Sequence, residues 1–113
     1  MPFTPRLVFV TASNLEEARN LARGILDKHL AACVNIVPGL ESHYWWQGKI
    51  ETAPEVQLVI KTSAEQFDAL AEVIRWHHSY DCPEIVAVPP AEISPEYRAW
   101  WEGSMQEQPP DSP

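Results

Sequence analysis

A long pair of extended segments around Gly48 constrains the fold of this chain more than any other feature. Strand-forming residues run from about residue 32 to 47 and return from 49 to 62, so the pattern predicts a β-hairpin that turns at 47–49. Pro54 lacks a backbone N–H, which predicts either a bulge or a sheet edge at that position. Both arms exceed the usual strand of about 5–6 residues, so they should project beyond the sheet.

The segment before the hairpin reads as a strand followed by a helix. Residues 6–13 are rich in β-branched and aromatic side chains, which is typical of a buried strand. Ser13 and Glu16 have the spacing of a capping box, and apolar residues then recur at three and four positions from Leu15 to His29. This pattern predicts a helix that lies on a sheet.

The segment after the hairpin repeats this rhythm. Overlapping cap signals at 62–66 begin a second helix that ends near the tandem histidines, and 84–89 reads as a last strand. Ser94 and Pro95 then begin a short helix. The order predicts an α+β fold, a ferredoxin-like βαββαβ sandwich with a long β-hairpin and a C-terminal helix.

Length and composition limit the class of protein. The 113 residues predict a single domain over 1–104 and a disordered tail over 105–113. The net charge of −8 repels phosphate backbones and argues against nucleic-acid binding. We expect no membrane span, since no run approaches about 20 apolar residues, and no secretory signal. A cytoplasmic protein with reduced thiols is the expectation.

The tip of the hairpin carries Tyr44, Trp45 and Trp46, which would be exposed on unpaired strands in a monomer. We therefore predict a symmetric homo-oligomer that uses this hairpin. The alternative is that these aromatic side chains fold back on the core of their own subunit. Trp45 and Trp46 could also stack on a ligand, although interface packing is the simpler interpretation.

His77 and His78 invite a metal-binding interpretation, but adjacent helical residues point about 100° apart. They can share an ion only if the helix ends between them or if another subunit supplies ligands. Histidines in the last helical turn also complement the helix dipole without any metal. Three roles therefore stay open for them: a structural role, a weak metal site and catalysis.

The two cysteines offer softer ligands. Cys33 and Cys82 form no CxxC pair, and one disulfide between them is possible but not required. Cys33 lies in a predicted buried strand and reads as a small apolar residue or a ligand. Cys82 has acidic neighbours, Asp81 and Glu84, which disfavour a nucleophilic thiolate but allow a soft-metal contact. Glu84 itself reads as an acceptor for a histidine ring, a general base or a strand-entry residue.

Several motifs together resemble the CutA divalent-cation tolerance family over residues 6 to 104. They are LAACVN, the hairpin tip Y-x-W-x-G-K, the KT that ends the third strand, and H-x-Y-x-x-P-E before the fourth. The resemblance implies a trimer of ferredoxin-like subunits, similar in architecture to PII-type signalling proteins. It also implies a role in tolerance to copper and other divalent ions.

The resemblance also implies site residues. The family's suggested copper ligands fall on His77 and His78, and Cys33 matches a cysteine implicated in metal binding. A cysteine that some members carry at the end of the first strand is replaced here by Val10, and Cys82 could partly compensate for it. Matches to the family pattern at Glu51, Lys61 and Tyr80 imply a cleft between subunits. The full set of residues expected at the subunit interface or in this cleft is Tyr44, Trp45, Trp46, Glu51, Lys61, Tyr80 and Glu84.

Three functions from different classes follow. The first is a non-enzymatic homotrimer that binds Cu(II) or another divalent cation weakly near subunit interfaces. The second is a PII-like small-molecule sensor with ligand clefts between subunits. The third is a hydrolase-like enzyme that uses His78 with Glu84. The sequence gives an enzyme little support, because it has no Ser-His-Asp order and too few glycines for a phosphate-binding loop.

Overall fold

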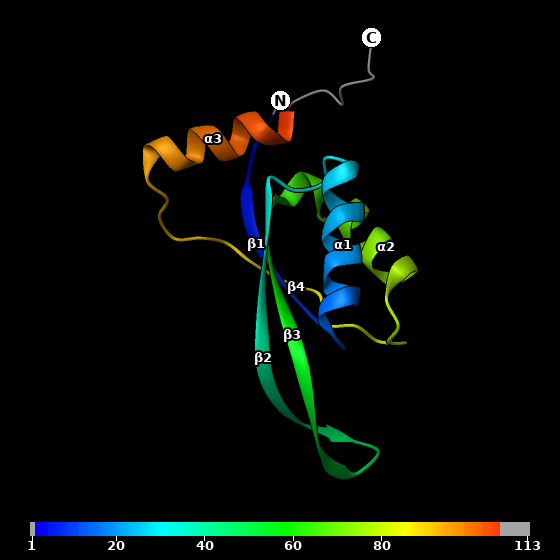
Figure 1. Cartoon of the computed structure of the whole chain (residues 1–113). Helices are drawn as coiled ribbons and strands as arrows, with labels where there is room; N and C mark the ends of the chain where they lie inside the picture. Colours follow the sequence, from blue (N-terminus) through cyan, green and yellow to red (C-terminus); the bar gives the residue numbers. More distant parts are fainter. Residues whose placement is uncertain (1, 107–113) are drawn as a thin grey trace.

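The protein contains one antiparallel sheet with strand order β2-β3-β1-β4 (Figure 1). A computed structural model of the chain describes residues 2–106. The order of elements confirms the predicted α+β ferredoxin-like βαββαβ fold with its long hairpin and C-terminal helix. The elements are β1 (Pro5–Ala12), α1 (Leu15–Asp27), β2 (Cys33–Trp46), β3 (Lys49–Ser63), the short 3₁₀ turn η1 (Ala64–Gln66), α2 (Phe67–His77), β4 (Val86–Val88) and α3 (Pro95–Gln106).

α1 and α2 cover one face of the sheet and enclose the core with it (Figure 1). Alternate residues of a strand point to the same face, so every second residue of β1 and β3 faces the helices. These core residues are fully or almost fully buried, as are their partners on the helices: Val8, Val10, Ala12, Val56, Leu58, Ile60, Leu21, Ile25, Leu70 and Ile74.

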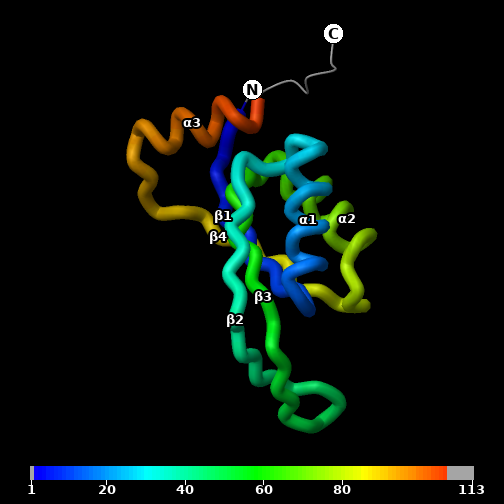
Figure 2. The backbone as a smooth tube through the Cα atoms, in the orientation of Figure 1, coloured from blue at the N-terminus to red at the C-terminus, as the bar shows by residue number. Residues whose placement is uncertain are grey.

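α3 lies on the side of the sheet away from α1 and α2, near the end of β3 (Figure 2). Its one fully buried residue is Trp101, whose Nε1 donates a hydrogen bond of 3.0 Å to the carbonyl oxygen of Thr62. The Trp101 ring also meets Phe3 edge to face at 6.2 Å between centroids. The indole of Trp101 is therefore the one side chain of α3 that is fully buried against the sheet, and Arg98 adds a contact with the ring of Phe3 at 5.2 Å.

The hairpin extends well beyond the rest of the sheet. Its two-residue turn lies at Gln47 and Gly48, within the predicted 47–49, and these residues adopt φ 51° and 78°. β2 and β3 pair as far as Trp46 and Lys49, whereas β1 pairs with β3 only over 56–63. Residues 40–55 therefore form a two-stranded hairpin arm, and no third strand of the described residues 2–106 lies beside it, as Figure 2 shows.

The irregularity in the hairpin does not lie at Pro54. The ladder shifts register between Val37 and Leu40, where Gly39 adopts φ 84°, and Pro54 pairs with Glu41 in regular register. The predicted bulge at Pro54 is therefore wrong, and the predicted sheet edge is right. Among the described strands, β3 has only β2 beside it at this point, so the missing N–H costs little.

Both ends of α1 differ from the prediction. Asn14, not Ser13, caps the helix, and its side chain accepts a hydrogen bond of 2.8 Å from the backbone of Glu17. The helix ends at Asp27, and His29 adopts φ 54° while the N–H of Leu30 bonds to the carbonyl of Ile25. His29 therefore belongs to a left-handed helix stop and not to the apolar stripe.

The C-terminal segment is partly as predicted. β4 is shorter than the predicted 84–89, and α3 continues to Gln106, two residues past the predicted end of the domain. The rest of the predicted tail, 107–113, lies outside the described residues. Over the part of the chain that the structure describes, no helix has the length and apolar character needed to cross a membrane.

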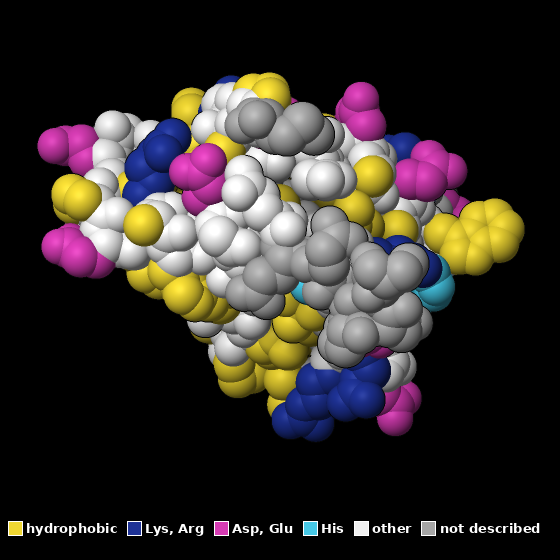
Figure 3. Space-filling view, turned by 90° about the horizontal axis from the view of Figure 1, so that it is seen from above, with side chains coloured by type: hydrophobic (Ala, Val, Ile, Leu, Met, Phe, Trp, Pro, Cys, Tyr) yellow, Lys and Arg dark blue, Asp and Glu magenta, His cyan; other side chains and the backbone are white. Residues whose placement is uncertain are grey.

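Large apolar side chains reach the surface in several places (Figure 3). On the hairpin arm Trp45 and Trp46 are 72% and 55% exposed, and Ile50 is 65% exposed. The alternative in which these aromatic residues fold back on the core of their own subunit is therefore wrong. Trp76 on α2 is more exposed still, at 83%.

Candidate functional site

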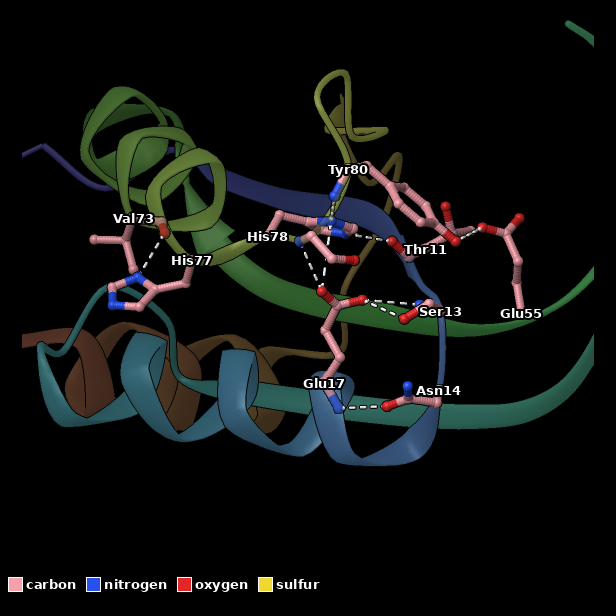
Figure 4. Close-up of polar contacts among 10 residues, drawn as sticks. Thr11, Ser13, Asn14, Glu17, Glu55, Val73, His77, His78 and Tyr80 are labelled. Atoms are coloured by element: carbon pink, nitrogen blue, oxygen red, sulfur yellow. Dashed lines mark hydrogen bonds and ion pairs between the residues drawn. The ribbon is translucent and has the colours of Figure 1, made fainter.

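The tandem histidines lie where α2 ends, and their side chains take different directions (Figure 4). His77 is the last residue of α2, whereas His78 has extended backbone with φ −83° and ψ 144°. Figure 4 shows His77 turned back toward Val73 of its own helix and His78 turned toward β1 and α1. The helix ends between the two residues, and their rings still do not converge on one point.

His77 retains a ring nitrogen that can bind a metal. Its Nδ1 lies 2.9 Å from the carbonyl oxygen of Val73, and because a carbonyl only accepts, Nδ1 carries the proton. In the neutral ring the lone pair is then on Nε2, and the side chain is exposed. His77 can therefore serve as a single ligand on the surface of α2.

His78 uses both ring nitrogens inside the protein. Nε2 donates to the carbonyl oxygen of Thr11 at 2.7 Å, and Nδ1 accepts from the backbone N–H of Tyr80 at 3.0 Å. Its side chain is fully buried. Because the only lone pair of the neutral ring already accepts a hydrogen bond, His78 cannot bind a metal or accept a proton without breaking that bond.

Glu17 joins the start of α1 to the segment that follows α2 (Figure 4). One carboxylate oxygen accepts from the backbone and the hydroxyl of Ser13, each at 2.9 Å, and the other accepts from the backbone of Ser79 at 2.8 Å. Nδ1 of His78 lies 3.8 Å away from the second oxygen. Burial alone would raise the pKa of Glu17, but these hydrogen bonds outweigh it and lower the pKa to about 2.

The segment after His78 forms one wall of a cleft, and the hairpin arm forms the other. The phenol of Tyr80 donates to the carboxylate of Glu55 on β3 at 2.7 Å, which ties the two walls together. Between them lies a cavity of about 710 Å³, here called the hairpin cleft. It is lined by residues of β1, of both strands of the hairpin and of the segment 80–84: Thr11, Leu40, Ser42, His43, Tyr44, Trp46, Glu55, Gln57, Tyr80, Asp81, Cys82 and Glu84.

The hairpin cleft is acidic. Burial and the nearby charge of Glu55 both raise the pKa of Glu84. The pKa of Tyr80 is also raised, first by burial and then by its hydrogen bond to Glu55. Among the described residues that line the cleft there is no lysine or arginine to balance these carboxylates. The site therefore favours cations over anions.

Five of the predicted site residues come together in this cleft, namely Tyr44, Trp46, Tyr80, Cys82 and Glu84. The other six lie elsewhere: His77, His78, Cys33, Trp45, Glu51 and Lys61. Within residues 2–106 no three His, Cys, Asp or Glu side chains are grouped closely enough to hold a metal ion. The four predicted metal ligands therefore do not form one chelate inside a single subunit.

Cys33 lies on the sheet at a distance from the cleft. It pairs with Lys61 across β2 and β3, and its sulfur is 4.0 Å from Nζ of that lysine. The same Nζ donates to Oδ1 of Asn35 at 2.6 Å and lies 5.7 Å from the ring centre of Tyr97. Val10, where some family members carry a cysteine, is fully buried in the core.

Sequence reasoning missed Glu17, Glu55 and His43. Glu17 follows Asn14 at capping distance, and a shift of the predicted cap by one residue would have revealed it. Glu55 and His43 had no local signal, because only the register of the hairpin brings them to the cleft. His43 is held by hydrogen bonds to Glu41 at 2.7 Å and to Thr52 at 3.1 Å.

The fold and the cleft define the class of this protein: a small ferredoxin-like α+β protein with an acidic cleft under a projecting hairpin. The family model described as CutA1 divalent ion tolerance protein matches residues 6–104. The chain therefore belongs to the CutA1 divalent ion tolerance protein family.

Relatives with known sequences agree with this assignment. The chain is 46% identical over 101 residues to "Protein CutA 1, chloroplastic" of Oryza sativa, covering 89% of this chain and 57% of that protein. It is 45% identical over 94 residues to "Divalent-cation tolerance protein CutA" of Thermus thermophilus, covering 83% and 91%. The chain thus spans little more than half the length of the plant relative and nearly all of the bacterial one.

Solved structures match as well. The crystal structure of CutA1 from Oryza sativa superposes with a TM-score of 0.87 at 44% identity, covering 94% of this chain and 98% of that one. The divalent cation tolerance protein from Thermus thermophilus gives a TM-score of 0.84 at 43% identity, covering 86% and 94%.

The lowered pKa of Glu17 predicts acid sensitivity. Its folded-state pKa is below the ordinary value of 4.5, so its contribution to stability is present above that value and is lost as the pH falls toward about 2. Glu17→Gln should lower the free energy of unfolding near pH 7 by up to roughly 3 kcal/mol and flatten its decline between these pH values. Urea unfolding as a function of pH measures both effects.

Glu16→Gln is the matched control, since Glu16 is exposed in the same helical turn. It should leave the acid branch of the stability curve unchanged. A Glu17→Gln protein with the same acid branch as the unmodified protein would contradict this assignment.

Proposed function

We propose that this protein acts in divalent-cation tolerance as a cytoplasmic homotrimer that binds divalent ions, copper among them, weakly and without catalysing a reaction. Family membership supports the tolerance role. The observation that carries the binding role is the hairpin cleft, which combines three carboxylates with the exposed thiol of Cys82 and has no lysine or arginine among its described lining residues. The cytoplasmic location is also a proposal, since one relative is named chloroplastic and another periplasmic.

Within one subunit, the protein provides separate single ligands for an ion, and these ligands do not form a chelate. Cys82 supplies a soft donor within the cleft, with Asp81 and Glu84 lining the same cavity. His77 supplies the lone pair of Nε2 from the end of α2, outside the cleft. Because no three donors are grouped in residues 2–106, each site is weak unless a second subunit adds ligands. The engaged nitrogens of His78 also argue against a general base at that position.

The metal proposal predicts unequal effects of the two cysteines. Cys82→Ser should weaken the binding of Cu²⁺ and of the redox-inert Zn²⁺ by about tenfold, a loss that even indirect changes to a metal site can produce. His77→Ala should weaken binding at a separate site. Isothermal titration under anaerobic conditions measures both affinities.

Cys33→Ser is the matched control, because Cys33 lies beside Lys61 and outside the cleft. It should leave both affinities unchanged. Equal affinities for the unmodified, Cys82→Ser and His77→Ala proteins would refute the proposed ligands.

The trimer is supported by two exposed apolar features. Trp45 and Ile50 lie directly opposite each other on the hairpin arm and do not line the cleft. On the face of the sheet away from α1 and α2, Phe9 and Val59 pair side by side and are only partly covered, and Val86 beside them is 49% exposed. An unpaired two-stranded arm with apolar side chains is a recurrent basis for association between chains.

If the trimer forms through the hairpin arm, substitutions on the arm should weaken it, whereas substitution of an exposed tryptophan elsewhere should not. Light scattering should give three times the chain mass of 12.8 kDa for the unmodified protein. Trp45→Ser with Ile50→Ser should shift it toward the monomer, because an apolar contact at the interface is lost. Trp76→Ser removes an even more exposed indole from α2 and should leave the mass unchanged. A monomeric unmodified protein would disprove the proposal.

A second candidate function is small-molecule sensing, which the volume of the hairpin cleft favours. At about 710 Å³ it falls within the range of roughly 300–1,000 Å³ that is usual for ligand pockets. A ligand specific for the folded protein must raise its melting temperature. A thermal-shift screen with nucleotides, amino acids, organic acids and amines should therefore yield at least one stabilising class, and Glu84→Gln should abolish its effect. A screen without any stabilising compound would count against this function.

A further inference from the structure

Three aromatic rings face the hairpin cleft from its two walls. Tyr44 and Trp46 are alternate residues of β2, so they lie on the same side of the strand, and both line the cavity. Tyr80 comes from the opposite wall, where its ring packs against His78 at 4.6 Å between centroids. The faces of such rings attract cations, and most strongly those of organic ammonium ions that have shed part of their water.

Carboxylates accompany these rings. Glu55 is oriented by the hydroxyl of Tyr80, and Glu84 lies close enough to it for the two negative charges to repel. A positive group placed between them would remove this repulsion. Asp81 adds a third carboxylate, and among the described lining residues there is no lysine or arginine that could supply the missing charge.

A bare metal ion would fill only a small part of this cavity. No three metal-binding side chains are grouped in residues 2–106, and about 710 Å³ greatly exceeds the volume of one ion. Its lining is a mixture of rings and carboxylates. An occupant that matches this lining has a positive charge and an apolar body.

We propose that the hairpin cleft binds a small organic ammonium ion, such as a protonated alkyl diamine. The ammonium groups donate hydrogen bonds to Glu55 and Glu84, and the alkyl chain packs against Tyr44, Trp46 and Tyr80. This inference rests on the small-molecule-binding role proposed above and assigns a chemical class to that ligand. The metal-binding role shares the cleft and Glu84 but is tested separately, through Cys82.

Isothermal titration of the full chain at neutral pH tests the inference with compounds of similar size and different charge. 1,4-Diaminobutane should bind, whereas the neutral 1,4-butanediol and the anionic succinate should not. Tetramethylammonium distinguishes the two sources of affinity, because it can contact the rings but has no N–H to donate. It should bind more weakly than the diamine. Mg²⁺ at the same concentration should compete poorly, since it lacks the apolar body.

Variants locate the site. Glu84→Gln should weaken binding of the diamine by about tenfold, the usual effect of losing one charge-assisted hydrogen bond. Trp46→Leu should weaken it by about threefold. Glu96→Gln removes the same charge from the first turn of α3, at an exposed position that does not line the cleft, and it should leave the affinity unchanged. Thermal unfolding of each variant verifies that the fold is retained.

The outcomes separate this inference from the function on which it rests. Equal weakening by Glu96→Gln and Glu84→Gln, or binding of the diol as tight as that of the diamine, would overturn the ammonium site. A neutral or anionic compound that binds in a Glu84-dependent manner would also overturn it while preserving a sensor role. No binding by any compound in the thermal-shift screen would refute both.

Discussion

The unequal lengths of neighbouring strands determine most of this structure. β3 has 15 residues and pairs with β2 from Lys49 to Lys61, but β1 has only eight, so within residues 2–106 the outer half of β3 has no second neighbour. The ladder hydrogen bonds within the hairpin keep both arms extended past the sheet. One consequence is the exposed aromatic surface of the arm. The other is that the arm forms one wall of the hairpin cleft, next to the end of β1.

The opposite wall depends on how the chain leaves α2. Glu17 holds the backbone of Ser79 and His78 holds that of Tyr80, so the first two residues after the histidines are bound to the start of α1 and the end of β1. The phenol of Tyr80 then reaches Glu55. His78 thus shapes the cleft through its buried ring, and of the two histidines only His77 presents a nitrogen to solvent.

The sequence predicted the features that depend on local patterns. Periodicity identified the order of strands and helices, the turn at Gln47 and Gly48 needed residues that tolerate positive φ, and Ser63 caps the turn before α2 as its spacing with Gln66 indicated. The site was less predictable, because its contacts join distant positions. The bond that sets the tautomer of His78 ends on Thr11, 67 residues away, and Glu55 reaches the cleft only through the hairpin register.

The position of the hairpin arm would link subunit association to ligand binding in the cleft. Beyond Val56 the arm is joined to the rest of the subunit through its own two strands, one of which bends at Gly39, and through the hydrogen bond between Glu55 and Tyr80. A small change in its angle therefore alters the width of the cleft. Any contact that holds the arm in one position restricts the ligand site as well, and by thermodynamic reciprocity an occupant of the cleft favours that same position. In a trimer built on this arm, association and ligand affinity would rise and fall together.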